Sequence, residues 1–427
     1  MTLFSRAFGL ICILLLIGTL SVSGQPSQVA VSPDTTISDS AKTPSDVEPY
    51  TSEKSVGHHI LAFPSYLLHW STRPIGWGVK WAEKTLPELL QGERSPYGVY
   101  PLFELGGDVG IAYGLLLYHN KFLTYNHQIR LEALFGSEEY NDFDLEYTIP
   151  SFISPGGQLN LDASYSNDPV KSFYGGNSST IDNERLYATE ELEGEIEYRN
   201  SISTKTQLRL SSRYWKMDIS RNETIIEDPL PLLSPQLRGT TSLLSMGSSI
   251  IFDFVKGTPR TVQGARYIAG LEWNRSLTDD EFHYLSYTLE WQQFFPLPFL
   301  PNSRRLAFKT SLEKAEPLGD KEIPFFDSPS LGSSYNLRGF SSDRFRDDGS
   351  LLLTLEYRYP MWNFADIVFF VDEGQVFNQY SDISINDFHT SYGFGLHLIS
   401  TKGFAFRSEF AFSRESSRVI LTINPNF

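Results

Sequence analysis

From Tyr97 onward, apolar and polar residues alternate along the chain with a period of two. Within His283–Gln293, the odd positions from Leu285 to Trp291 are Leu, Tyr, Leu and Trp, and the even positions from Ser286 to Gln292 are Ser, Thr, Glu and Gln. The same alternation appears in Leu351–Tyr359 and Gly403–Phe412. Successive side chains of a β-strand point to opposite faces, so the pattern predicts strands with one apolar and one polar face. A soluble β-sandwich has the same alternation, so the pattern does not identify the environment.

The N-terminal residues and the composition favour a membrane protein. Arg6 precedes an apolar run from Ala7 to Leu20, and small residues follow it, which predicts a secretory signal peptide over residues 1–24. Cys12, the single cysteine, lies inside this segment, so we expect no disulfide or thiolate metal site in the mature chain. The chain holds 31 Phe and 22 Tyr, yet no second apolar run is long enough for a spanning helix. This combination is typical of a transmembrane β-barrel.

We therefore predict an all-β membrane protein, a 16-stranded antiparallel transmembrane β-barrel with a short N-terminal helical segment. Backbone groups in lipid must be satisfied internally, so the sheet must close, and an even strand number returns both ends to the periplasm. The long polar stretches Asn167–Glu190, Met217–Thr241 and Lys314–Gly349 then fall on the extracellular side. The sixteen strands are predicted to start near Tyr97, Val109, Leu123, Phe143, Gln158, Leu192, Thr206, Leu243, Tyr267, His283, Arg305, Ser350, Ala365, Thr390, Gly403 and Val419.

Two segments precede the strands. Residues 25–56 are rich in Ser, Pro, Thr and Asp, which predicts a disordered periplasmic linker. Residues 57–93 contain Trp70, Trp77 and Trp81 and are interpreted as a short helical segment, broken near Pro74, at the periplasmic interface. A helix that plugs the lumen is the alternative, and it stays open. The barrel is expected over residues 94–427.

The chemistry of the chain concentrates in one loop and two strands. Arg338 lies in the sequence Asn336–Phe340, within the longest polar stretch, and Gly339 is expected to supply a backbone conformation that other residues avoid. The alternation places Glu356 and Asp372 on the lumenal face, and a hairpin that turns near Phe364 puts them roughly opposite each other. Two carboxylates at this spacing can hold one planar guanidinium.

These motifs resemble the C-terminal barrel of the BamA/TamA superfamily, the bacterial surface antigen family of outer-membrane assembly and translocation proteins. The family motif is Val/Leu-Arg-Gly-Phe/Tyr on an inward-folded loop, followed by Phe-x-Asp-x-Gly on the next strand but one, and the chain ends in an aromatic residue. The residues that match are Leu337, Arg338, Gly339 and Phe340 in the loop, Phe370, Asp372 and Gly374 in the strand, and Phe427 at the end.

The resemblance implies roles for these residues. Arg338 is expected to dock onto Glu356 and Asp372 and to pin the loop inside the barrel. Phe427 is expected to act as the C-terminal signal that assembly machinery reads. Larger members carry periplasmic POTRA domains, for which the linker is too short, so we expect a short member without them.

The resemblance implies a barrel of the bacterial cell outer membrane that inserts or transports polypeptide, or lipid, without ATP. Its expected partners are outer-membrane lipids, a polypeptide or lipid client and a periplasmic protein. A passive channel or structural barrel is the alternative. No catalytic motif is found, so we expect no enzyme activity, cofactor or metal, and His397 is interpreted as a solvated lumenal residue. The formal net charge of -16 argues against nucleic acid as a partner.

The strands that close the barrel each contain a proline, Pro101 in the first and Pro425 in the last. Proline lacks a backbone donor and is confined to sheet edges or strand ends. The seam between these strands is therefore predicted to be the weakest pair, and in the resembling family it opens toward lipid. Alternatively, both prolines lie beyond the last paired residue. A disulfide between positions near Gly98 and Thr422 is expected to lock the seam.

Overall fold

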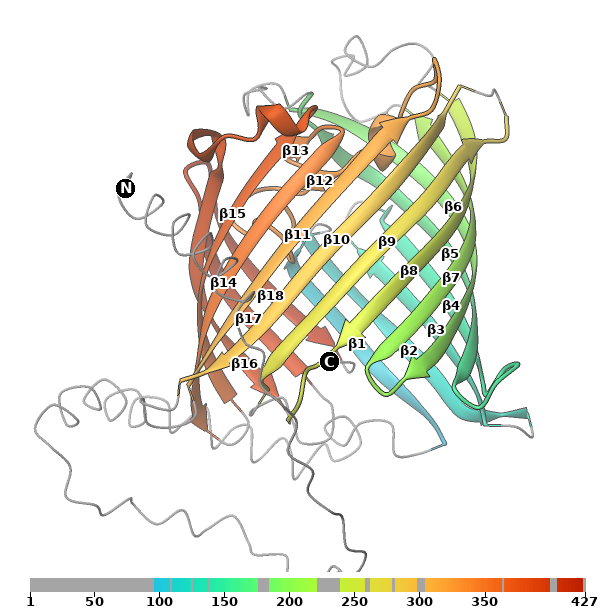
Figure 1. Ribbon diagram of the computed structural model, residues 1–427, viewed down its shortest axis with the longest axis horizontal. Helices are drawn as coiled ribbons and strands as arrows, with labels where there is room; N and C mark the ends of the chain where they lie inside the picture. The colour runs from blue at the N-terminus through green and yellow to red at the C-terminus, as the bar shows by residue number, and fades with distance from the viewer. Residues whose placement is uncertain are drawn as a thin grey trace, which may run out of the picture. The chain divides into compact units, whose positions relative to one another are not determined.

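The computed structural model describes residues 96–424, with gaps at 108–109, 124–125, 137–138, 176–183, 221–238, 258–261, 279–280, 298–303, 363–364 and 400–404 (Figure 1). The predicted signal peptide, linker and helical segment lie outside the described residues, as do Pro425 and Phe427. Within the described residues, no helix is long and apolar enough to cross a membrane.

Sixteen of the described strands close into one antiparallel barrel, as predicted, in the order β1-β18-β17-β16-β15-β14-β11-β10-β9-β8-β7-β6-β5-β4-β3-β2. Two further short strands, β12 and β13, pair with each other inside the connection between β11 and β14. The strands are β1 Tyr97–Gly107, β2 Gly110–Phe122, β3 His127–Gly136, β4 Asn141–Pro150, β5 Gly157–Phe173, β6 Arg185–Ser203, β7 Thr206–Ser220, β8 Gly239–Asp253, β9 Gly264–Ser276, β10 His283–Pro296, β11 Arg305–Pro317, β12 Ser330–Leu331, β13 Phe345–Arg346, β14 Gly349–Trp362, β15 Ala365–Phe377, β16 His389–Ile399, β17 Ala405–Phe412 and β18 Ser417–Asn424.

The long connections are shorter than the sequence pattern predicts, because several strands extend past the alternating stretches. β6 begins at Arg185, whereas the pattern places its start near Leu192, and β5 continues to Phe173. Likewise β11 reaches Pro317, so the central loop spans residues 318–348. A strand that projects beyond the bilayer has no lipid on its outer face, so apolar alternation is lost there while backbone pairing continues.

The two faces of the sheet differ as the alternation predicts. Large apolar side chains on the outside are exposed, among them Leu131, Leu145, Leu192, Ile196, Leu271, Leu289, Phe369, Phe394 and Phe410. The polar neighbours of these residues point into the lumen, where Asp372 and Glu409 are buried beside other charged groups. The inner face of the barrel is therefore polar, and its buried residues must be covered by another part of the chain.

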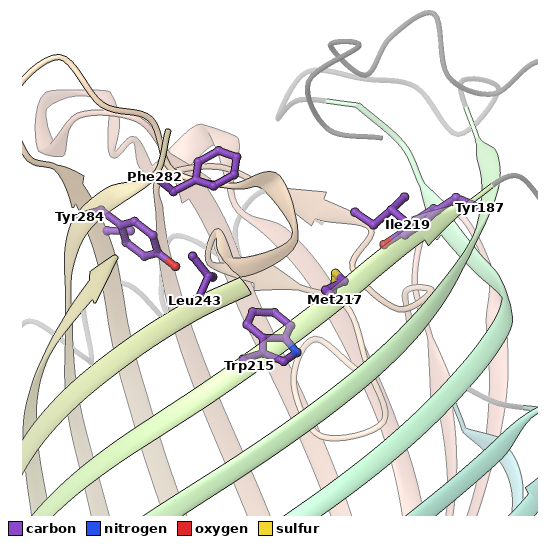
Figure 2. Close-up of a cluster of buried hydrophobic side chains, with 8 residues drawn as sticks. Tyr187, Trp215, Met217, Ile219, Leu243, Phe282 and Tyr284 are labelled. Carbon is purple, nitrogen blue, oxygen red and sulfur yellow. The ribbon is translucent and has the colours of Figure 1, made fainter. Parts of the chain in front are cut away.

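The loop 318–348 covers these buried residues, and its apolar residues take part in two clusters. Its 3-10 turn η6, Phe325–Asp327, packs against buried residues of β6, β7, β8 and β10. Figure 2 shows this cluster, which comprises Tyr187, Trp215, Met217, Ile219, Leu243, Phe282, Tyr284 and Ala315. A second cluster joins four loop residues, Leu331, Leu337, Phe340 and Phe345, to Leu352 of β14 and Val376 of β15. The loop is thus a packed part of the fold.

The seam between β1 and β18 has the shortest ladder among the barrel's described strand pairs. It pairs at Glu104↔Thr422 and Leu105↔Leu421, two positions, whereas β1 and β2 pair at ten. Pro101 lies outside this paired part. Gly98 is six residues from Glu104, roughly 20 Å along an extended strand, so the expected Gly98–Thr422 disulfide is wrong and the register places Glu104 opposite Thr422.

Candidate functional site

Arg338 lies at the inner end of the loop, where three strands present carboxylates to it. Its Nε and Nη2 donate to Asp372 Oδ2 and Oδ1 at 2.9 and 2.8 Å, and its backbone N–H donates to Oδ2 at 3.2 Å. Nη1 donates to Glu356 at 3.0 Å and to Glu409 at 3.2 Å. The fork geometry of guanidinium matches a carboxylate in this bidentate way, which a lysine cannot reproduce.

The register explains how β14 and β15 position two of these carboxylates. Glu356 lies directly opposite Phe370, and Asp372 lies opposite Thr354. The two carboxylates are therefore diagonal neighbours on the same face of the sheet. Thr354 and Ser391 donate to Asp372 at 3.0 and 3.1 Å. These bonds orient the carboxylate that binds the guanidinium.

Glu409 of β17 is a third partner that sequence reasoning did not assign to Arg338. It is fully buried, and it pairs with His397 at 2.8 Å and with Arg407 at 3.4 Å. His397 is therefore buried against Glu409 and is not the solvated residue that we expected. The signal available in the sequence was the alternation itself, which places Glu409 on the lumenal face of its strand.

The electrostatic balance of the site keeps Arg338 charged. Burial acts to lower the pKa of its guanidinium, but the carboxylates of Asp372, Glu356 and Glu409 outweigh burial and raise it. Arg358 also contacts Glu356, at 2.8 Å, and so shares the negative charge. A buried cation surrounded by hydrogen-bonded carboxylates is held in one geometry, because every alternative leaves a charge unpaired.

The ring of Phe370 packs against the guanidinium of Arg338. Its Cζ lies 3.5 Å from the centroid of the Phe370 ring, within cation–π range. Two glycines of β16 make room for this ring and for Glu409. A Cβ at Gly393 would lie 2.5 Å from Phe370 Cζ, and one at Gly395 would lie 2.6 Å from Glu409 Cγ.

The other motif residues hold the loop against the strands. Gly339 does not have the unusual backbone conformation that we expected; instead a Cβ there would lie 2.8 Å from the backbone of Phe412. The left-handed residue is Leu337, with φ of 44°, whose buried side chain lies against Gly374. Phe340 is fully buried beside Phe345, with ring centroids 5.1 Å apart. Gly339 and Gly374 thus permit close approach.

The contacts of Arg338 with the strands indicate a structural role for this site. The guanidinium of Arg338 is bound by protein carboxylates, and no cluster of His, Cys, Asp and Glu suited to a metal ion occurs among the described residues. The arrangement is a clamp that fixes a loop.

Comparison with known proteins places the barrel in a family. The Omp85 superfamily domain matches residues 121–418. The fold is similar to that of BamA from Haemophilus ducreyi lacking POTRA domains 1–3, at 15% identity and a TM-score of 0.58, over 81% of this chain and 78% of that one. No curated protein sequence matches the chain.

Two further solved structures have the same fold. CdiB from Acinetobacter baumannii is 12% identical, with a TM-score of 0.51, over 77% of this chain and 59% of that chain. CdiB from Escherichia coli is 11% identical, with a TM-score of 0.52, over 78% and 63%. The superfamily match extends over well more than half of the sequence, from β2 into β18. The chain therefore belongs to the Omp85 superfamily and is a β-barrel of the bacterial outer membrane.

Proposed function

We propose that this barrel inserts or transports polypeptide, or lipid, at the outer membrane without ATP, and that its route is the seam between β1 and β18. The observation that carries the proposal is the two-position pairing of these strands. Unpaired backbone groups in a bilayer cost several kcal/mol each, so a short ladder is the place where an added strand gains most. An incoming strand of a client can supply the missing partners.

The role of the loop supports the same route. Arg338, bound to Glu356 and Asp372, holds a packed loop inside the lumen. A fixed loop obstructs direct passage through the lumen and leaves the wall as the alternative. In this proposal the loop motif Leu337, Arg338, Gly339 and Phe340 keeps the β14–β17 side of the barrel rigid while the seam yields. Outer-membrane lipids and a periplasmic partner that delivers the client complete the system.

A reversible disulfide across the seam tests the proposal. Glu104→Cys with Thr422→Cys joins two directly opposite positions, in a chain whose only cysteine is Cys12. The assay is the folding rate of a urea-unfolded model outer-membrane barrel into liposomes that contain the variant. We expect the oxidised form to lose the acceleration and the reduced form to regain it.

A matched control uses a disulfide between Ser164→Cys and Glu193→Cys, which are opposite each other in the long β5–β6 ladder. This disulfide should leave the acceleration unchanged. Full acceleration by the oxidised seam variant would contradict the proposed route.

A polar cavity favours one second candidate, a passive channel. It measures about 540 Å³, lies between the loop and β6–β11, and is lined by residues that include Ser211, Thr288, Asp327 and Arg346. A channel predicts steady conductance of the unmodified barrel in planar bilayers, unaffected by the seam disulfide. The assembly proposal predicts little conductance until Arg338→Ala releases the loop.

A further inference from the structure

The loop has a second arginine anchor at its outer end. Arg344 donates from Nε to Glu415 Oε2 at 2.7 Å and from Nη2 to Glu415 Oε1 at 3.1 Å. Its side chain is 3% exposed, and Glu415 belongs to the turn between β17 and β18. The pair is bidentate and nearly dry, the geometry in which a charged hydrogen bond is strongest. The two anchors are six residues apart in the sequence.

The same hairpin receives two more contacts from the loop. Ser416 Oγ donates to the carbonyl of Gly339 at 2.7 Å, and Arg418 donates to the carbonyl of Phe340. The loop therefore contacts the β17–β18 hairpin both at its turn and at the start of β18. On its free side β18 pairs with β1 at two positions, whereas it pairs with β17 at eight. The placement of β18 thus depends strongly on β17 and the loop.

Arg344 also contacts the other side of the barrel mouth. Its guanidinium lies 4.9 Å from the centroid of the Tyr174 ring, which follows β5 directly, and 4.7 Å from that of Phe345. Tyr174 is 2% exposed. In the barrel order β1 to β4 lie between β18 and β5. One side chain therefore connects the strands that flank this four-strand segment.

We propose that Arg344 is a positioning residue that fixes the β17–β18 hairpin, and with it the β18 edge of the seam, to the loop and to the end of β5. When β1 separates, β18 keeps its place and presents an ordered edge to the incoming strand. This use of the edge rests on the proposed function, but the anchoring itself does not. A strand edge that is already ordered costs less conformational entropy to pair than a mobile one.

Hydrogen exchange of the purified barrel in lipid nanodiscs tests the anchoring. Arg344→Ala should speed exchange of the amides in the β17–β18 turn and in β18, residues 413–424, by about tenfold or more, because local opening reports the lost contacts. Amides of β14 and β15 should be unchanged, since Arg338 still binds Asp372 and Glu356.

Arg346→Ala is the matched control, because this arginine lies on the same loop and bonds the carbonyls of Phe325 and Ser328 and the carboxylate of Asp343, all within the loop. An equal rise in the control, an unchanged hairpin in Arg344→Ala, or a uniform rise over the whole barrel would each overturn the proposal.

Glu415→Gln serves if Arg344→Ala does not fold, because it keeps the shape of the side chain and removes its charge. A rise in exchange confined to the hairpin supports the anchor, and none refutes it. The measurement needs no client, so its outcome is independent of the seam disulfide experiment.

Discussion

Replacing Arg338 by alanine should release the inner end of the loop while the barrel stays closed. The substitution removes four side-chain hydrogen bonds, two to Asp372 and one each to Glu356 and Glu409. Asp372 is 1% exposed and remains as a buried charge without its main partner, whereas the buried Glu409 keeps His397 and Arg407. The barrel ladders do not involve this side chain, and they should survive the change.

The size of the effect follows from the burial. Removing one partner of a buried ion pair costs about 3–5 kcal/mol, because the remaining charge is uncompensated. Loss of the cation–π contact with Phe370 adds about 1 kcal/mol. Since about 1.4 kcal/mol corresponds to a tenfold change in an equilibrium constant, the loop should open roughly 10³ to 10⁴ times more often.

Hydrogen exchange of the amides in residues 333–344 measures this opening directly. The double variant Arg338→Ala, Asp372→Asn should recover part of the loss, because it removes one of the stranded charges. Exchange in the loop that rises less than about tenfold would refute the reasoning, since it would mean that the apolar cluster around Leu337 and Phe340 holds the loop alone. Equal rises in loop and strands would show a general loss of stability.

Gly339→Ala should destabilise the docked loop by about 1–3 kcal/mol, because the added Cβ meets the Phe412 backbone. Gly319→Ala is the control, because its Cβ meets no atom and adds only the strain of a φ of 70°. Hydrogen exchange rates of the loop amides compare the two variants. Burial raises the pKa of Asp327, so its stabilising contribution is present at acid pH and is lost as pH rises through the raised pKa. Asp327→Asn should therefore raise Tm relative to the unmodified protein at neutral pH and less at acid pH; the opposite trend would contradict the assignment. Deleting Phe427 should reduce outer-membrane levels in cells more than refolding yield in detergent, and equal losses would indicate a purely structural residue.

The parity of the strands made much of the fold and part of the site predictable. Because the side-chain period of a strand is two, the faces of Glu356 and Asp372 follow directly from their neighbours. The strand count and the closed sheet follow from the same alternation, together with the need to pair every backbone group in lipid. These inferences use only local sequence.

Other parts of the site depend on contacts across the lumen, which local sequence does not record. Glu409 lies 71 positions from Arg338, and nothing in the period indicates that the loop reaches it. The partner of His397 was missed for the same reason. The role of Gly339 was misjudged because close approach to Phe412 is a tertiary property, while the unusual backbone belongs to Leu337.

The two-strand sheet inside the loop has a consequence for the entropy of docking. Ser330 and Leu331 pair with Arg346 and Phe345, so the loop is closed at a neck and its inner part forms a smaller ring. Each halving of a flexible loop lowers its closure cost by about 0.6 kcal/mol. A released loop keeps this paired neck, and Arg338 lies midway along the ring that the neck closes. The paired neck therefore lowers the conformational entropy that the inner part of the loop loses when it docks.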